Sequence, residues 1–337
     1  MVRELIYEPG SLDFPNWEFD LDSDVSSMGD TTYRSLIDSI RETKGCVESK
    51  LDIMLFKEVL RKFTGLKQIT VRNECSDGLR RFTKVFPSGH QLQAITEGLE
   101  HSTIKITDLK GLNLDLSQLH HIPLHRIAAT CGELKSLSLH FDGNDGPSRA
   151  DLDERIRSGA MRTLLTSLTE LEYLSLDFPI FSRWHIVRGD LRGIIPPGFR
   201  WKNLRDVRLS FLESERTELF EFFKLHRSTL RTVHMHNFSL RTTSCTKLLR
   251  QMRETLTLQD LCISQRLFGK PEDPEEEGQN FYLGDENSEL ASALTTWYFE
   301  NSPDTLTTAL ERCDTYTYTI LEFYGNSLVA NLTSLLG

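Results

Sequence analysis

One short phrase recurs along the chain, and it constrains the fold more than any other feature of the sequence. The segment LKSLSLH at 134–140 is nearly repeated as LEYLSLD at 171–177, LRDVRLS at 204–210, LRTVHMH at 230–236 and LQDLCIS at 258–264. Each copy has the form L-x-x-L-x-L, or a close variant of it, in which the last apolar residues alternate with polar ones. This alternation places the apolar side chains on one face of a short β-strand. The sequence therefore predicts a series of equivalent strands, each with one buried face.

Two further copies, LKQITV at 66–71 and LKGLNL at 109–114, extend the series toward the N-terminus. Some intervals between copies, of 25, 26 and 28 residues, fall within the ~20–29 residues of a leucine-rich repeat, and the longer intervals require insertions. The pattern predicts an α/β fold: a degenerate leucine-rich-repeat-like solenoid with a curved, mainly parallel sheet and helices on its outer face.

The segments between the phrases have helical periodicity, with apolar residues at i, i+4 steps. Helices are predicted within 49–65, 153–170, 214–229 and 244–257. Ser214 and Ser244 precede the last two helices and are predicted as their N-caps, because a serine hydroxyl accepts a hydrogen bond from an unpaired N–H of the first turn. A single strand–helix unit is too small to bury its own apolar face, so the units are expected to stack.

The predicted organisation has four parts. Residues 1–48 are expected to be an irregular N-terminal lead-in and cap, and residues 49–268 the solenoid. Residues 269–289 carry eight acidic side chains against one lysine and are expected to form a solvated acidic loop. Residues 290–337 are expected to form a C-terminal cap, with a helix over ELASALTTWYFENS and a strand over 315–325.

Composition narrows the class of protein. With 39% hydrophobic and 26% charged residues among 337, the chain is globular, and its apolar runs are shorter than the ~20 residues of a membrane span. The six cysteines are scattered without a CxxC pair, which indicates reduced thiols in the cytoplasm or nucleus. A net charge of −10 disfavours nucleic acid as the main partner. We therefore expect a protein partner and no membrane.

If the leucines of each phrase point into the core, the residues between them point away from it. In a solenoid this other side of the sheet is the usual binding surface, and Tyr, Arg, His and charged residues there are the best candidates for protein contacts. Gly111 also falls at such a position. The residues predicted to bind protein are Arg72, His140, Tyr173, Asp177, Asp206, Arg208, His234 and His236.

Catalytic and metal sites are weaker interpretations of the same residues. The HMH segment at 234–236 places two histidines on one strand face, and HHIPLH sets His121 and His125 four residues apart. A zinc site needs further ligands, and the chain has no HExxH. It also has no G-x-S-x-G, GxGxxG or GxxxxGK[ST] motif. We predict no catalytic residue, no metal and no cofactor; a hydrolase or metal enzyme on a degenerate α/β repeat is the alternative.

The chain also resembles a known family. The opening VRELIYEPG, the units containing LKSLSLHFDG and LEYLSLDFP, and the segment FRWKNLRDVRLS are similar to fungal F-box and leucine-rich-repeat-like proteins, over roughly residues 1–264. The resemblance implies the target-recognition part of a cullin–RING ubiquitin-ligase receptor. In such a receptor an F-box binds a Skp-type adaptor and the solenoid selects the target.

The F-box itself is not readable in this sequence. The L-P-x-E-[IL] opening and the three short helices that should precede VRELIY are missing. A Skp-type adaptor is therefore expected as a partner only if an F-box is encoded upstream of Met1. A protein ligand or ubiquitination target on the concave face is expected in either case.

Overall fold

The structure is a computed structural model, and the chain forms two compact units. Unit 1 comprises residues 1–187 with 193–195, and unit 2 comprises residues 188–192 and 196–337. The residues that the structure describes are 3–7, 50–63, 65–71, 88–115, 124–142, 158–178, 189–241, 245–269, 279–282 and 289–300.

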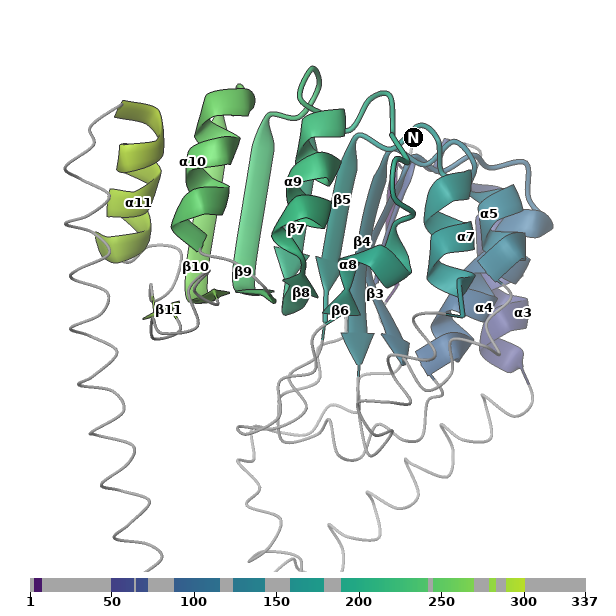
Figure 1. The fold of residues 1–337 in the computed structure, drawn as a ribbon. Coiled ribbons are helices and arrows are strands. Elements are labelled where there is room, and N and C mark those ends of the chain that lie inside the picture. Colours follow the sequence, from purple (N-terminus) through teal and green to yellow (C-terminus); the bar gives the residue numbers. More distant parts are fainter. Residues whose placement is uncertain are drawn as a thin grey trace, which may run out of the picture. The chain divides into compact units, whose positions relative to one another are not determined.

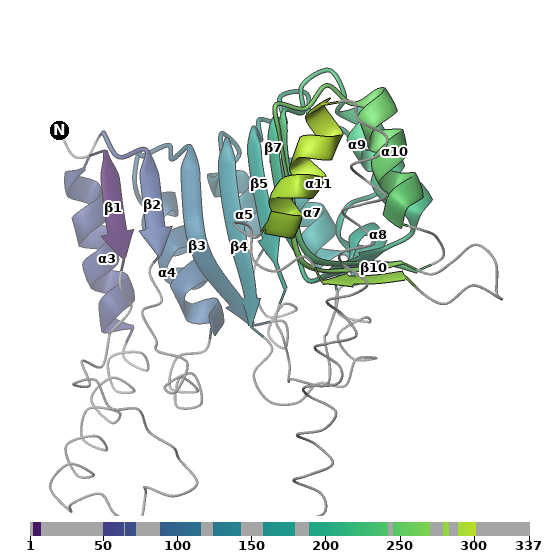
Figure 2. The same cartoon turned by 90° about the vertical axis from the view of Figure 1, so that its left-hand side faces the viewer.

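Unit 1 is an α/β structure with a parallel sheet. Its strands pair in chain order and are β1 (Glu4–Tyr7), β2 (Gln68–Val71), β3 (Asp108–Asp115), β4 (Ser136–Asp142) and β5 (Tyr173–Asp177). Its helices are α3 (Leu51–Lys62), α4 (Ser88–Glu100), α5 (Leu124–Thr130) and α7 (Ala160–Ser167). Figure 2 shows these four helices on one face of strands β1 to β5.

The alternation of the repeated phrase decides which side chains of unit 1 form its core. Ile69, Leu109, Leu137 and Leu174 pair in register across β2 to β5, and none is more than 2% exposed. Burying one such side chain stabilises the fold by about 1.5–3 kcal/mol. This row therefore holds the helices against the sheet, as the sequence pattern predicts.

Unit 2 is also an α/β structure. Strands β7 (Asp206–Ser210), β9 (Thr232–Leu240) and β10 (Asp260–Gly269) are parallel neighbours, β11 (Gln279–Tyr282) runs antiparallel to β10, β8 (Leu212–Ser214) is parallel to β9, and β6 (Gly189–Asp190) is parallel to β8. The helices are α8 (Leu191–Ile194), which has residues of both units, α9 (Arg216–Leu225), α10 (Cys245–Thr255) and α11 (Glu289–Glu300). Figure 1 shows α9 and α10 on the same face of this sheet.

Helix α11 packs against β10, the last of the parallel strands. The Thr295 hydroxyl donates a hydrogen bond of 2.9 Å to the carbonyl of Leu261, so it satisfies a backbone acceptor of the strand. The sequence predicts a helix in this region, and the structure has one.

The same backbone junction precedes several strands of both units. In each case the carbonyl of the residue before one strand accepts hydrogen bonds from two successive N–H groups at the start of the next strand, at 2.7–3.1 Å. The accepting residues are Arg3, Lys67, Thr107 and Lys135 in unit 1 and Arg205 and Arg231 in unit 2. Successive strand–helix segments therefore begin in the same local conformation.

The buried histidine His226 fixes the loop before β7 in unit 2. Its Nε2 accepts a 3.0 Å hydrogen bond from the backbone N–H of Trp201, and its Nδ1 lies 2.7 Å from the carbonyl of Phe222. His226 and the Trp201 ring are both fully buried. Because the Phe222 carbonyl only accepts and the Trp201 N–H only donates, the ring is neutral with its proton on Nδ1. Burial lowers the pKa of His226; the Phe222 carbonyl opposes this effect and the charge of Arg200 adds to it.

Three segments of unit 2 have a residue with left-handed backbone conformation at corresponding positions of neighbouring strands. Phe211, Asn237 and Gln265 have φ values of 55°, 50° and 62°, which is the left-handed region that most side chains avoid. They directly follow Ser210, His236 and Ser264, which pair in register across β7, β9 and β10. The repeated phrase ends at this level in each strand, and the backbone turns there.

A bulge in β3 changes the predicted alignment of one phrase. Leu109 pairs with Leu137, the fourth residue of LKSLSLH, and Leu112 pairs with Leu139, so two residues of β3 lie opposite Ser138. The extra residue is Gly111, at φ 70°. The phrase at 109–114 is therefore shifted, and Gly111 is not equivalent to the outward residues of the other strands. A bulge has no strong sequence signal apart from its glycine.

Other expectations differ at element ends. The structure has a 13-residue helix, α4, that the sequence analysis did not predict. Ser214 is wrong as an N-cap: it lies in β8, and the N-cap of α9 is Glu215, which makes no side-chain capping bond. Ser244 and the strand expected at 315–325 lie outside the described residues.

Two strands and the division between the units lie inside segments of the predicted organisation. Strand β1 lies within 1–48, the expected irregular lead-in and cap, and β11 lies within the expected acidic loop at 269–289. The division between the two units falls inside the region 49–268 that was expected to be one solenoid.

Candidate functional site

The polar half of each repeated phrase forms the face of the sheet opposite the buried leucines, which we call the displayed face. In unit 2 this face has three registered rows. From the start of the strands they are Asp206, Thr232 and Asp260; Arg208, His234 and Cys262; and Ser210, His236 and Ser264. The intervening residues, such as Val207, Val233 and Leu261, are at most 1% exposed. The predicted alternation is therefore confirmed for these three strands.

Charged and imidazole groups converge at the start of this face. The Nε2 of His234 lies 2.9 Å from Oδ2 of Asp260 on the neighbouring strand, and because a carboxylate only accepts, Nε2 carries the proton. The Nε of Arg208 lies 3.8 Å from Oδ1 of Asp206. The side chains of Asp260 and Arg208 are 55% and 47% exposed. They are therefore available to a partner in solution.

Asp206 is the perturbed group of the cluster. Burial raises the pKa of its carboxyl, the neighbouring Arg208 and His234 lower it, and the like charge of Asp260 raises it; the net effect is a raised pKa. Its buried oxygen Oδ1 accepts no hydrogen bond from any residue in the described part of the chain. A half-buried carboxylate without a donor at one oxygen is a cost to folding.

The far row of the face is more enclosed. The Nδ1 of His236 lies 2.9 Å from the hydroxyl of Ser264, and the ring of Phe211 meets the His236 ring edge-on with centroids 5.6 Å apart. Ser264 is only 4% exposed. This row supports the face rather than presenting large groups to solvent.

Unit 1 has a corresponding polar face. Nδ1 of His140 in β4 lies 2.6 Å from Oδ2 of Asp177 in β5, with which it pairs in register. Tyr173 is half-buried at the start of β5, in register with Ser136. At the edge of this sheet formed by β1, the carboxylate of Glu4 accepts hydrogen bonds from Gln68 and Thr70 of β2 at 2.7 and 3.0 Å.

The structure thus brings several predicted residues together within each unit. Asp206, Arg208 and His234 form one cluster in unit 2, with His236 one row further along. His140 and Asp177 form a pair in unit 1, and Tyr173 lies at the opposite end of the same strand. Arg72 lies outside the described residues.

Asp260 was left out of the predicted binding residues although it is the direct partner of His234. The signal was present in the sequence, because Asp260 has the same position in LQDLCIS as Asp206 has in LRDVRLS. The parallel register makes the two aspartates occupy one row.

The histidines and cysteines do not assemble into a metal site in the described part of the chain, where no group of three His, Cys, Asp or Glu residues could hold a metal ion. His121 lies outside it. Cys131 and Cys245 are buried, and burial raises the pKa of the Cys131 thiol to about 12. Such thiols are poor nucleophiles at neutral pH. Cys262 is half-buried on the displayed face.

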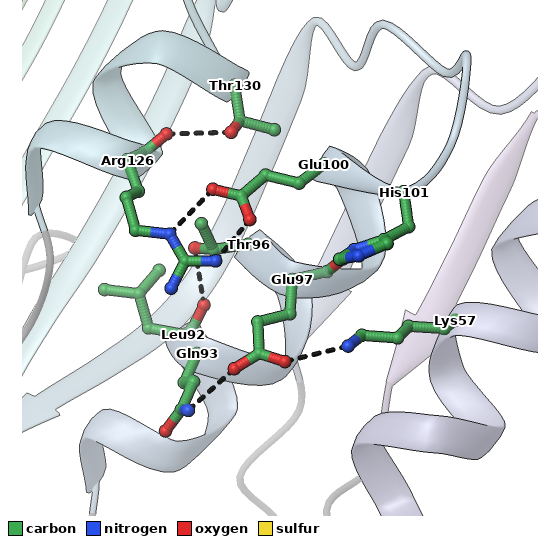
Figure 3. Close-up of polar contacts among 9 residues, drawn as sticks. All are labelled: Lys57, Leu92, Gln93, Thr96, Glu97, Glu100, His101, Arg126 and Thr130. Atoms are coloured by element: carbon green, nitrogen blue, oxygen red, sulfur yellow. Dashed lines mark hydrogen bonds and ion pairs between the residues drawn. The ribbon is translucent and has the colours of Figure 1, made fainter.

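A polar network on the helix layer of unit 1 has a structural role (Figure 3). Glu97 in α4 accepts hydrogen bonds from Lys57 in α3, at 2.9 Å, and from Gln93, at 2.7 Å. Burial raises the pKa of Glu97, but these hydrogen bonds and the positive charge of Lys57 outweigh it, so the pKa is lowered. Glu100 pairs with Arg126 of α5 through both carboxylate oxygens. Each of these carboxylates has its partners within the layer.

The arrangement is suited to recognition. Strands of a packed sheet hold Arg208, His234 and Asp260 in fixed register, and the exposed Arg208 and Asp260 offer donors and acceptors to solvent. Rigid polar groups of both signs on one surface give orientation and specificity to a bound protein. No helix in the described part of the chain is long and apolar enough to cross a membrane.

The chain was compared with known proteins. No protein family model matches it, and neither a curated protein nor a solved structure matches it.

Proposed function

We propose that this protein is a non-enzymatic interaction protein, built of leucine-rich-repeat-like units, that binds a protein partner on the displayed face. The observation that carries the proposal is the cluster of exposed Arg208 and Asp260 with half-buried His234 on three adjacent strands of unit 2. Arginine and pairs of opposite charge with fixed geometry are typical of residues that dominate protein–protein binding.

The solenoid interpretation rests on two further observations. Strands β2, β5 and β7 bury every second residue, and the two-donor carbonyl junction recurs before successive strands in both units. Repeat units that contact mainly their neighbours are expected to share such a junction. A solenoid leaves the displayed face of each unit for binding.

Site-specific photo-cross-linking tests the proposal. A photoreactive amino acid is placed at Arg208 on the displayed face, and in a matched variant at Arg250, which is exposed on α10. In cells, the first variant should form an adduct with a particular protein that the second does not form. That protein is then purified and its dissociation constant for the wild-type chain is measured. Arg208→Ala should raise the constant about tenfold, or ~1.4 kcal/mol, whereas Arg250→Ala should leave it unchanged.

Two results would contradict the proposal. Equal adducts from Arg208 and Arg250 would mean that the displayed face has no preference for a partner. A partner whose affinity is unchanged by Arg208→Ala and by Asp260→Ala would be bound by another surface.

We further propose that the bound protein is a ubiquitination target, a step that rests on the resemblance to F-box and leucine-rich-repeat-like proteins alone. The native protein, isolated from its own cells, should then co-purify with a Skp-type adaptor and a cullin. Isolation of the native protein without an adaptor, while the Arg208-dependent partner is still present, would remove the ligase role and leave the binding role.

A further inference from the structure

A strongly basic rim lies at the start of the strands of unit 2. It is formed by the loops before β7 and β9, residues 196–205 and 226–231, which contain no Asp or Glu. The basic residues of the rim are Arg200, Lys202, Arg205, Arg227 and Arg231. The first four have exposed side chains, and Arg231 is half-buried. In a chain with a net charge of −10, such a concentration of positive charge is a local feature.

The backbone of the rim is fixed by buried contacts. Trp201 and His226 join the two loops through the 3.0 Å hydrogen bond between them, and the Arg231 N–H donates to the carbonyl of Arg205 at 2.8 Å. Arg200 donates to the hydroxyl of Ser228 at 2.9 Å. The basic side chains therefore project from a preorganised surface, which lowers the entropy cost of binding.

Structural roles account for only part of this charge. The guanidinium of Arg231 donates to the carbonyls of Leu230 and Ser228, and Arg200 holds Ser228. Arg205 and Arg227 form no ion pair within the part of the chain that the structure describes, and Arg205 is the backbone neighbour of Arg231. Like charges side by side on neighbouring strands are destabilising, and an anionic partner would remove that cost.

We propose that this rim is a second binding surface, separate from the displayed face, that takes a short acidic segment of another protein in extended conformation. Strands lie about 4.8 Å apart, so the loops before β7 and β9 match a few carboxylates of one peptide. A nucleic acid would need a longer basic surface to neutralise its many phosphates, and the chain has a net charge of −10. A short acidic peptide needs only the few cations of these two loops.

The test uses the full chain and a fluorescent hexaglutamate peptide at low ionic strength, with binding followed by anisotropy. The peptide should bind in the micromolar range, and raising the salt from about 20 to 200 mM should weaken it about tenfold. The double variant R205E/R227E should weaken binding at least about tenfold. The matched variant K247E/R250E makes the same change in charge on exposed positions of α10 and should bind within about twofold of wild type.

Equal weakening by the two variants would show that only the net charge matters, and would overturn the proposal. So would tighter binding of a DNA duplex than of hexaglutamate at equal salt. Circular dichroism of both variants is the control that they are folded. Because Arg208 is not part of the rim, R208A should leave hexaglutamate binding unchanged, so this result and the cross-linking result can fail independently.

Discussion

Replacing Gly111 by alanine should disrupt unit 1 far more than the loss of a flexible residue would. A Cβ at Gly111 would lie 2.1 Å from the backbone oxygen of Val71 in β2, a separation that Cβ atoms essentially never show. Gly159 provides the control in the same unit, because its φ of 86° is equally unfavourable for alanine but nothing lies within 4 Å of its added Cβ. The contact with the neighbouring strand is the steric difference between the two substitutions.

The expected cost follows from that geometry. An alanine at positive φ costs about 1 kcal/mol in either variant. At Gly111 the strands β2 and β3 must also separate by 1.3 Å, from 2.1 Å to the 3.4 Å at which ordinary contacts begin. This weakens one or two backbone hydrogen bonds, each worth about 0.5–1.5 kcal/mol and more when its groups are left buried and unpaired. We expect a loss of about 3–5 kcal/mol for Gly111→Ala and about 1 kcal/mol for Gly159→Ala.

Hydrogen exchange resolved by segment is the suitable assay, because a chain with two compact units need not unfold in one step. Gly111→Ala should raise the exchange rate of the amides in β2 and β3 by at least about a hundredfold, and leave β9 and β10 of unit 2 unchanged. Equal effects of the two substitutions on β2 and β3 would refute the argument. The bulge would then be free to relax without moving β2.

Three further experiments test charges and buried polar groups. His226→Phe removes the acceptor of the Trp201 N–H and should destabilise unit 2 by about 2–4 kcal/mol, measured by urea denaturation. Because the folded pKa of His226 is lowered, its stabilisation is complete above the unfolded value of about 6.5 and is lost as the pH falls below it; the phenylalanine variant should lack this pH dependence. Asp206 has a raised folded pKa, so its protonated form favours folding below pH ~4 and ionisation costs stability as the pH rises. Asp206→Asn should therefore raise the melting temperature at pH 7 and change it little at pH 3. A double-mutant cycle over Glu100 and Arg126, whose hydrogen bond lowers the pKa of Glu100, should give only a small coupling free energy, because solvent and salt screen an exposed pair.

The sequence was most informative where one physical rule decides the structure. Burial of every second residue follows from strand geometry, so the phrases at 171–177, 204–210, 230–236 and 258–264 predicted β5, β7, β9 and β10 and their inward faces. The apolar i, i+4 steps in 49–65 likewise predicted α3. Parallel pairing in chain order follows when similar strands are separated by helices.

The expectations that differ depend on contacts between distant residues. Ser214 has the chemistry of an N-cap, but pairing of β8 with β9 places it in a strand, and the hydroxyl donates to the Glu215 carbonyl instead. Gly111 reads as one more spacer between leucines, and only the position of β2 beside it explains the glycine. Local propensity is overruled at such points by tertiary structure.

The outward position of the candidate-site residues was predictable for the same reason as the core. Which of these residues lie close together was not predictable from the alternation. Parity alone places Asp206, Arg208 and His234 on the outward side of their strands, but a repeat gives every strand an outward side. Register then determines which outward residues meet. It places Asp206 and Asp260 in one row, and His234 in the next row reaches Asp260 through its Nε2. The loops before the strands are not constrained by the alternation, so periodicity does not predict that their basic residues form a surface. The two surfaces are consequently separable, and each has its own test in Arg208 or in Arg205 and Arg227.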